Sequence, residues 1–178
     1  MTPNELSARL RIMQEALQNP ALRDRMAVAA CNQISALVKR RVFRDGIAQD
    51  GGKIGSYSTK PAYFSTSIPG LPKVAPKGKA KRAKKTYYSE TGYKGFRDKV
   101  GRQSGKVDLN LTGGTFSNVG VGQSASGVIA FGIKDSKSAE IIAGNEKRFG
   151  VVTVTPNEEE RKAAIEAAKA ELKFALGF

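Results

Sequence analysis

The sequence predicts an α+β fold, in which N-terminal helices and a C-terminal helix accompany a small antiparallel β-sheet of about 3–4 strands. Apolar residues recur at helical spacing near both ends of the chain, and alternating apolar and polar residues between glycine-rich turns follow residue 107. Between these regions lies a long basic stretch without periodicity, which predicts an extended insertion. We therefore expect one domain, residues 1–178, made of N-terminal helices (1–46), an extended basic arm (47–106) and a sheet carrying the C-terminal helix (107–178).

Two helices are expected in the N-terminal part. Residues 3–17 carry apolar side chains every three or four positions, which is typical of an amphipathic helix. Asn19 followed by Pro20 indicates an N-cap with proline in the first helical position, so a second helix should begin there. Gly46 should end this helix. The apolar side of the first helix consists of Leu6, Leu10, Met13 and Leu17.

The basic arm concentrates the charge of the protein. From Lys73 to Lys106 there are twelve Lys or Arg against only Glu90 and Asp98, so this segment holds +10 of the formal net charge of +14. Aromatic residues are interleaved with the basic ones, which argues against complete disorder, and we expect the arm to become ordered on contact with a partner. The predicted partner-binding residues are Lys77, Lys79, Lys81, Arg82, Lys84, Lys85, Tyr87, Tyr88, Tyr93, Phe96, Arg97 and Arg102.

Short strands are expected after the arm. Alternation over residues 107–112 predicts a half-buried strand, and residues 116–121 and 128–133 predict two more in an antiparallel meander. A helical turn is expected from Ser138 to about Ala143. Residues 151–155 are a candidate for a fourth strand.

The last helix has the clearest start signal. Thr155, Pro156 and Glu158 fit the N-cap, the first-position proline and the acidic residue of a capping box. Gly177 can close the helix at its C-terminus. The expected apolar stripe consists of Ile165, Ala168, Leu172 and Leu176.

The residue inventory argues against an enzyme. The chain contains no His, which removes the commonest general base and a common metal ligand. One Cys and scattered acidic residues give no metal-binding cluster, and no phosphate-binding loop is present. We therefore predict no catalytic residue, no metal and no cofactor. Without a long apolar run or a signal-peptide pattern, we also expect synthesis in a cytosol and no membrane contact.

Three stretches carry a resemblance to a known group: "VDLNLTGGTFSNVGV", "SAEIIAGNEKRFG" and "TVTPNEEE". Following an N-terminal helix pair and a long insertion, these stretches in their order resemble the tail-completion and neck proteins of tailed bacteriophages, the minor virion morphogenesis and head-tail connector proteins. The family's Arg-Pro-Phe element is changed here, because Arg148 and Phe149 are adjacent. The matching residues are Leu111, Thr112, Gly113, Ile129 to Ile133, Ala139, Glu146, Arg148, Phe149, Gly150, Thr155 and Glu158.

The resemblance implies a structural virion protein in the neck or tail region, made in the cytoplasm of a bacterial host. Such a protein would form a homo-oligomeric ring and join the portal to the tail, with portal, adaptor and tail subunits as partners. The basic arm would then dock on neighbouring subunits, and lysines facing the lumen would contact genomic DNA without sequence specificity. Two alternatives remain from the residues alone: a nucleic-acid-binding protein using segment 73–106, or a solvated loop without a partner.

Overall fold

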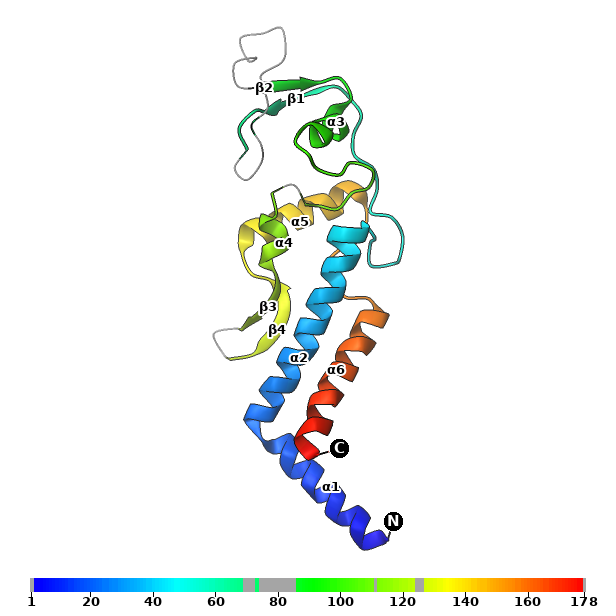
Figure 1. The fold of residues 1–178 in the computed structure, drawn as a ribbon, viewed down its shortest axis with the longest axis vertical. Coiled ribbons are helices and arrows are strands. Elements are labelled where there is room, and N and C mark those ends of the chain that lie inside the picture. The colour runs from blue at the N-terminus through cyan, green and yellow to red at the C-terminus, as the bar shows by residue number, and fades with distance from the viewer. Residues whose placement is uncertain (1, 69–72, 74–85, 111, 124–126, 178) are drawn as a thin grey trace. The chain divides into compact units, whose positions relative to one another are not determined.

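The computed structural model describes residues 2–68, 73, 86–110, 112–123 and 127–177 (Figure 1). The helical elements in this part of the chain are α1 (Pro3–Gln18), α2 (Pro20–Lys39), the π-helical turn η1 (Arg40–Asp45), α3 (Gly92–Lys99), α4 (Gly114–Asn118), α5 (Ser136–Phe149) and α6 (Glu158–Leu176). The strands are β1 (Ala62–Ser65), β2 (Thr86–Ser89), β3 (Val119–Gln123) and β4 (Ile129–Ile133). The predicted α+β fold with a C-terminal helix is confirmed.

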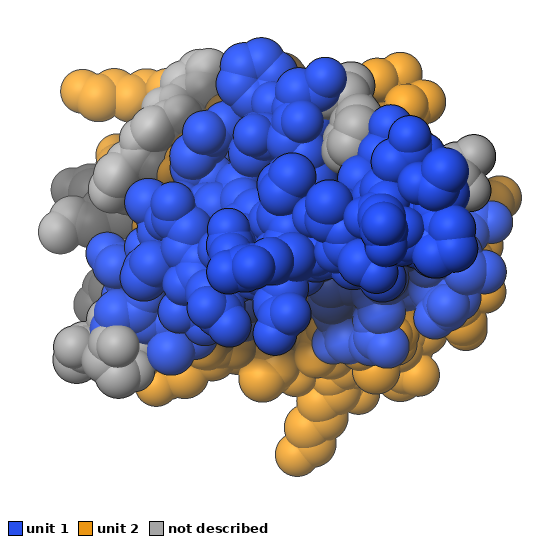
Figure 2. All heavy atoms as spheres, turned by 90° about the horizontal axis from the view of Figure 1, so that it is seen from below, with its two compact units in different colours: residues 1–38, 119–134, 155–178 blue, residues 39–118, 135–154 orange. Residues whose placement is uncertain are grey.

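The chain forms two compact units, each built from segments that are far apart in the sequence (Figure 2). Unit 1 contains residues 1–38, 119–134 and 155–178, and unit 2 contains residues 39–118 and 135–154. The predicted division into helices, arm and sheet follows the order of the chain, whereas the units do not. The prediction of one domain stays a prediction.

Unit 1 consists of α1, α2, α6 and the β3–β4 hairpin. The predicted cap of α2 is confirmed, because Asn19 Oδ1 accepts hydrogen bonds from the amides of Ala21 (2.9 Å) and Leu22 (3.4 Å). Arg25 of α2 and Glu171 of α6 form an ion pair of 2.7 Å, which connects these two helices.

Unit 2 combines the β1–β2 sheet with α3, α4 and α5. The four described strands thus form two antiparallel pairs, β1–β2 and β3–β4, instead of one predicted meander. In the first pair Tyr63 lies opposite Tyr88, and in the second Val121 lies opposite Phe131. The predicted end of the N-terminal helical region at Gly46 is confirmed, since this residue has φ of 69° directly after η1.

The predicted extended arm, residues 47–106, contains more structure than its composition indicates. Both strands of the first sheet and the helix α3 belong to it. Its aromatic side chains account for the difference, because they pack on one another within unit 2. The prediction of an extended segment is therefore wrong for α3, and the strands pair within the molecule. Residues 74–85, the most basic stretch, lie outside the described residues.

The predicted strand at residues 107–112 is wrong for its described part. Asp108 occupies a position where alternation would expose a polar side chain, yet it is only 6% exposed. Leu109 has φ of 52°, which interrupts a regular strand. The Asp108 side chain points inward because its carboxylate pairs with the buried guanidinium of Arg97. This need for a counter-charge outweighs the alternating pattern of the sequence.

The predicted strand at residues 151–155 is also wrong. Thr153 is fully buried, and both its amide and its hydroxyl donate to Glu146 Oε1, at 2.6 and 2.8 Å. The Thr153 carbonyl accepts from Arg41 Nη1 at 3.0 Å. Side chains therefore satisfy the polar groups that a strand would have paired with another strand.

The region between these segments is more helical than predicted. The strand expected at 116–121 begins only at Val119, because α4 precedes it, whereas the strand expected at 128–133 is confirmed as β4. The expected helical turn at 138–143 is part of the longer α5. Asp135 caps α5 by accepting from the Ser138 amide at 2.9 Å.

The cap of α6 is shifted from its predicted place. Asn157, not Thr155, is the N-cap: its Oδ1 accepts from the Glu160 amide (2.9 Å), and Glu160 Oε2 accepts from the Asn157 amide (2.8 Å). Pro156 therefore precedes the cap instead of following it. Gly177 ends the helix with φ of 74°, as predicted, but Ile165 of the predicted apolar stripe is 54% exposed.

Replacing Asn157 by Ala should lower the free energy of unfolding by about 1 kcal/mol, because the first turn of α6 loses its side-chain acceptor. Urea unfolding followed by circular dichroism measures this change. Asn157→Ser keeps an acceptor at the cap and should behave like the natural protein. Equal losses in both variants would show that the capping box does not stabilise α6.

Candidate functional site

An aromatic cluster in unit 2 supports one side of the candidate site. The Phe64 and Phe96 rings are stacked with 4.6 Å between their centres, and Tyr93 lies 5.6 Å from Phe64. Tyr87 completes the cluster, and Phe96 is only 1% exposed. The cluster joins β1, β2 and α3, so residues of the predicted arm form a core of their own.

Gly92 makes the close approach of α3 possible. It has φ of 62°, a conformation that favours glycine, and a Cβ at this position would lie 2.7 Å from the Ser58 carbonyl oxygen. Tyr93 follows directly and reaches the Tyr57 ring edge to face, with 5.3 Å between ring centres. The start of α3 is thereby fixed against the segment that carries Tyr57.

A buried ion pair lies next to the cluster. Arg97 Nη2 donates to both carboxylate oxygens of Asp108, at 3.0 and 3.2 Å, and the two side chains are 1% and 9% exposed. The same guanidinium donates to the carbonyls of Gln103 (2.7 Å) and Asn110 (3.1 Å). Such extensive hydrogen bonding is what a charge removed from water requires.

Tyr57 completes this buried network. Its hydroxyl donates to Asp108 Oδ1 at 2.8 Å and accepts from the Asp108 amide at 3.1 Å. The Arg97 guanidinium lies 4.4 Å from the centre of the Tyr57 ring, within the range of a cation–π contact. Burial raises the pKa of the Tyr57 hydroxyl well above its ordinary value, so that it stays neutral and keeps donating.

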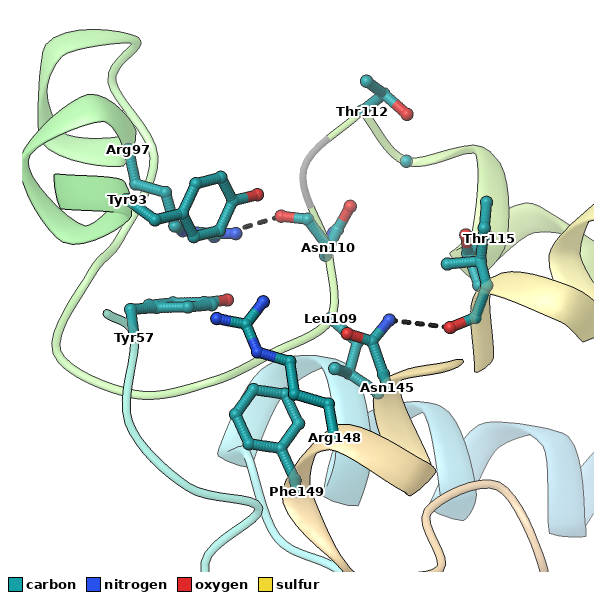
Figure 3. A pocket seen from close by; sticks show the side chains of 12 residues that line it. Tyr57, Tyr93, Arg97, Leu109, Asn110, Thr112, Thr115, Asn145, Arg148 and Phe149 are labelled. Carbon is teal, nitrogen blue, oxygen red and sulfur yellow. Dashed lines mark hydrogen bonds between the residues drawn. The ribbon is translucent and has the colours of Figure 1, made fainter. Parts of the chain in front are cut away.

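A pocket of about 310 Å³ opens beside the network (Figure 3). Tyr57 and Tyr93 line it from the aromatic side, and Asn145, Arg148 and Phe149 line it from α5. In Figure 3 the Arg148 side chain extends from the end of α5 toward Tyr57. Its guanidinium lies 5.5 Å from the centre of the Phe149 ring. The pocket therefore combines aromatic surfaces with one exposed cation.

The end of α5 holds these two residues in place. Gly150 has φ of 69° and its amide donates to the Glu146 carbonyl at 2.8 Å, which ends the helix directly after Phe149. The Phe149 ring packs on Gly55, where an added Cβ would lie 2.7 Å from a ring carbon. Backbone geometry at both glycines thus determines where the Arg148–Phe149 pair lies.

The predicted partner-binding residues do not form one surface among the described residues, and they lie in different environments. Tyr87 and Tyr93 belong to the aromatic cluster, and Tyr88 packs on Tyr63 at 4.9 Å. The prediction is wrong for Phe96 and Arg97, because each is only 1% exposed: Phe96 packs in the aromatic cluster and Arg97 pairs with Asp108. Arg102, which is partly exposed, does not line the pocket. The remaining six, Lys77, Lys79, Lys81, Arg82, Lys84 and Lys85, lie outside the described residues.

The sequence did not indicate that Tyr57 lies beside Arg148, nor that Asp108 holds Tyr57 and Arg97 in place. The stretch "NEKRFG" did single out Arg148 and Phe149, but nothing in it indicates that Tyr57, about ninety positions earlier, lines the same pocket. Asp108 had a signal of a different kind, since an acidic residue in a strongly basic region is a candidate partner for a buried arginine.

Comparison of the chain with protein-family models, with curated proteins and with solved structures finds no match. In the described residues, no helix is both long enough and apolar enough to cross a membrane. Nor do the Cys, Asp and Glu residues of the described ranges form a group of three or more that could hold a metal ion.

Asp108→Asn should lower the free energy of unfolding by about 3–5 kcal/mol, because it leaves the Arg97 charge buried without a counter-charge. Chemical unfolding followed by tyrosine fluorescence measures the loss. Glu15→Gln is the control, since it removes an exposed ion pair to Arg11 of 3.1 Å and should leave stability unchanged. Similar effects in the two variants would contradict a central role of the buried pair.

One tyrosine should ionise well above pH 10.0, the ordinary pKa of the side chain, because Tyr57 is held neutral by burial. Since the folded state has the higher pKa, the stabilising contribution of the Tyr57 hydroxyl is complete below pH 10.0 and decreases as the pH rises further. The absorbance of tyrosinate during an alkaline titration measures this. Tyr57→Phe should remove the late component, whereas replacing exposed Tyr63 by Phe should leave it; its persistence in Tyr57→Phe would refute the assignment.

Proposed function

We propose that this protein is a structural subunit of the neck of a tailed bacteriophage, a ring-forming head-tail connector or tail-completion protein that joins the portal to the tail. The resemblance of residues 105–176 to that family led to the hypothesis. The observation that carries it is the uncovered apolar face of α1, since a subunit of an assembly needs surfaces that only its neighbours cover.

The apolar face of α1 is uncovered along the whole helix. Leu6, Leu10, Met13 and Leu17 are 50%, 57%, 37% and 42% exposed, and no described residue of α1 is buried. Their spacing of four, three and four residues places them in one row, as in the contact seam of a coiled coil. Leaving such a row in water is unfavourable, so contact with another subunit would stabilise it.

Unit 1 exposes further large apolar side chains outside α1. Phe174 near the end of α6 is 75% exposed, although Arg25 lies 5.7 Å from its ring centre. Val128 at the β3–β4 turn is 59% exposed. Apolar surface on helices and on a hairpin gives this unit several faces for lateral contacts, as a subunit within a ring requires.

The basic arm supplies a second means of assembly in this proposal. Its strands β1 and β2 are anchored in unit 2 by the aromatic cluster, and residues 66–85 connect them. Lysines and arginines of this connection would dock on acidic surfaces of neighbouring subunits, where electrostatic complementarity sets orientation and speeds association. Lysines that face a lumen would contact the genome.

Leu10→Glu should prevent self-assembly, because it places a charge in the middle of the apolar row of α1. Light scattering after size exclusion, together with negative-stain electron microscopy, should show rings or higher oligomers for the natural protein and monomers for the variant. Ala8→Glu puts the same charge on the opposite, exposed side of α1 and should leave assembly intact. Loss of assembly in both variants would show that the apolar row of α1 is not the specific contact surface.

Labelling of the protein in particles from its source tests the location. Density in the neck, together with weak DNA binding at moderate salt, is the expected result. Absence from particles, together with tight DNA binding that falls steeply with salt, would replace the proposal by the nucleic-acid-binding alternative.

A further inference from the structure

A second pocket of unit 2 adjoins the one in Figure 3. It has a volume of about 240 Å³ and is lined by Lys60 and Phe64, among others. Tyr93 and Arg148 line both pockets, so the two are neighbours on either side of these side chains. The larger pocket is lined by residues of α5 and the smaller one by residues of β1, and the two neighbouring pockets are called the groove below.

The charge of this groove has one sign. Arg148 and Lys60 are both exposed, and neither forms an ion pair with the described residues. Arg97, which also lines the larger pocket, is neutralised by Asp108. Among the described residues that line the two pockets, none is Asp or Glu. A ligand with a carboxylate or another anionic group would therefore supply the missing counter-charge.

The walls of the groove are fixed before any ligand arrives. Tyr57 is held by two hydrogen bonds to Asp108, and Phe149 packs on Gly55. Stacking on Phe149 restricts the Arg148 guanidinium and leaves its N–H groups available for a fork of hydrogen bonds to a carboxylate. Preorganised aromatic and cationic groups lower the entropic cost of binding.

Asn110 adds an unsatisfied polar atom to the same pocket. Its Oδ1 is buried and accepts no hydrogen bond from the described residues. Buried polar atoms normally have a partner, and because this oxygen is closed to solvent, an N–H group of a ligand would reach it once the Asn110 amide turns toward the pocket. A peptide carries such groups along its backbone.

The number of cations favours a peptide over a nucleic acid. Binding of single strands depends on several phosphate contacts, whereas the described residues of the groove offer only Arg148 and Lys60 as unpaired cations. Two cations and several aromatic walls match an extended segment in which acidic side chains alternate with large apolar ones.

We propose that this groove binds an extended acidic segment of a partner protein, with an aromatic side chain in the larger pocket and a carboxylate on Arg148. The inference rests on unit 2 alone and does not require the connector role. Its failure would leave the α1 row and the location in particles untouched, and failure of the connector proposal would leave the groove.

Fluorescence anisotropy with the full chain tests the groove. The probe is a labelled peptide of about eight residues in which glutamate and phenylalanine alternate, measured at physiological ionic strength. Arg148→Ala should weaken binding about tenfold, because it removes a charge-assisted, two-pronged contact. Lys147→Ala is the matched control, since this neighbouring cation does not line either pocket, and it should change affinity less than about twofold. Circular dichroism confirms that both variants are folded.

Each other outcome overturns the inference. No binding by the natural protein, or unchanged binding by Arg148→Ala, would mean that the groove is not the site. Equal losses in Arg148→Ala and Lys147→Ala would indicate general attraction to a basic protein. Displacement of the peptide by an oligothymidine of about eight nucleotides, dependent on Arg148, would assign the groove to nucleic acid instead.

Discussion

The buried pair of Arg97 and Asp108 is the interaction on which unit 2 depends. A guanidinium that is 1% exposed is tolerated only when its donors are used, and here carbonyls of two residues and one carboxylate use them. The segment after α3 therefore folds back toward the Arg97 guanidinium, and the Asp108 side chain points into the core. The local backbone, including the positive φ of Leu109, follows from that demand.

The same interaction shapes the groove. Asp108 fixes the Tyr57 hydroxyl, Tyr57 packs on Tyr93, and Tyr93 lines both pockets. Because Asp108 neutralises Arg97, the charge left for a ligand belongs to Arg148 and Lys60. One buried carboxylate therefore both stabilises the unit and determines which cations remain available.

The two units offer different chemistry for recognition. Unit 1 exposes apolar side chains on α1, on α6 and at the β3–β4 turn, which suits desolvation against similar surfaces. Unit 2 offers a cationic groove with aromatic walls, which suits an acidic segment and depends on charge. Contacts of the first kind tolerate salt and those of the second kind weaken with it, so a protein with both surfaces can combine salt-resistant packing with charge-dependent docking.

The sequence alone determined the helices with local signals: the cap at Asn19, the apolar row of α1, the glycine that ends α6 and the α+β class. These features depend on residues a few positions apart, which periodicity and capping rules can detect. Tertiary structure decided the rest. Asp108 and Thr153 lie in stretches with the alternation of a strand. In the folded protein, however, Asp108 accepts from Arg97, and Thr153 bonds to Arg41 and Glu146, so neither residue is part of a strand. Phe96 and Arg97 resemble anchors for a partner, and only long-range packing shows that their partners lie within the chain itself.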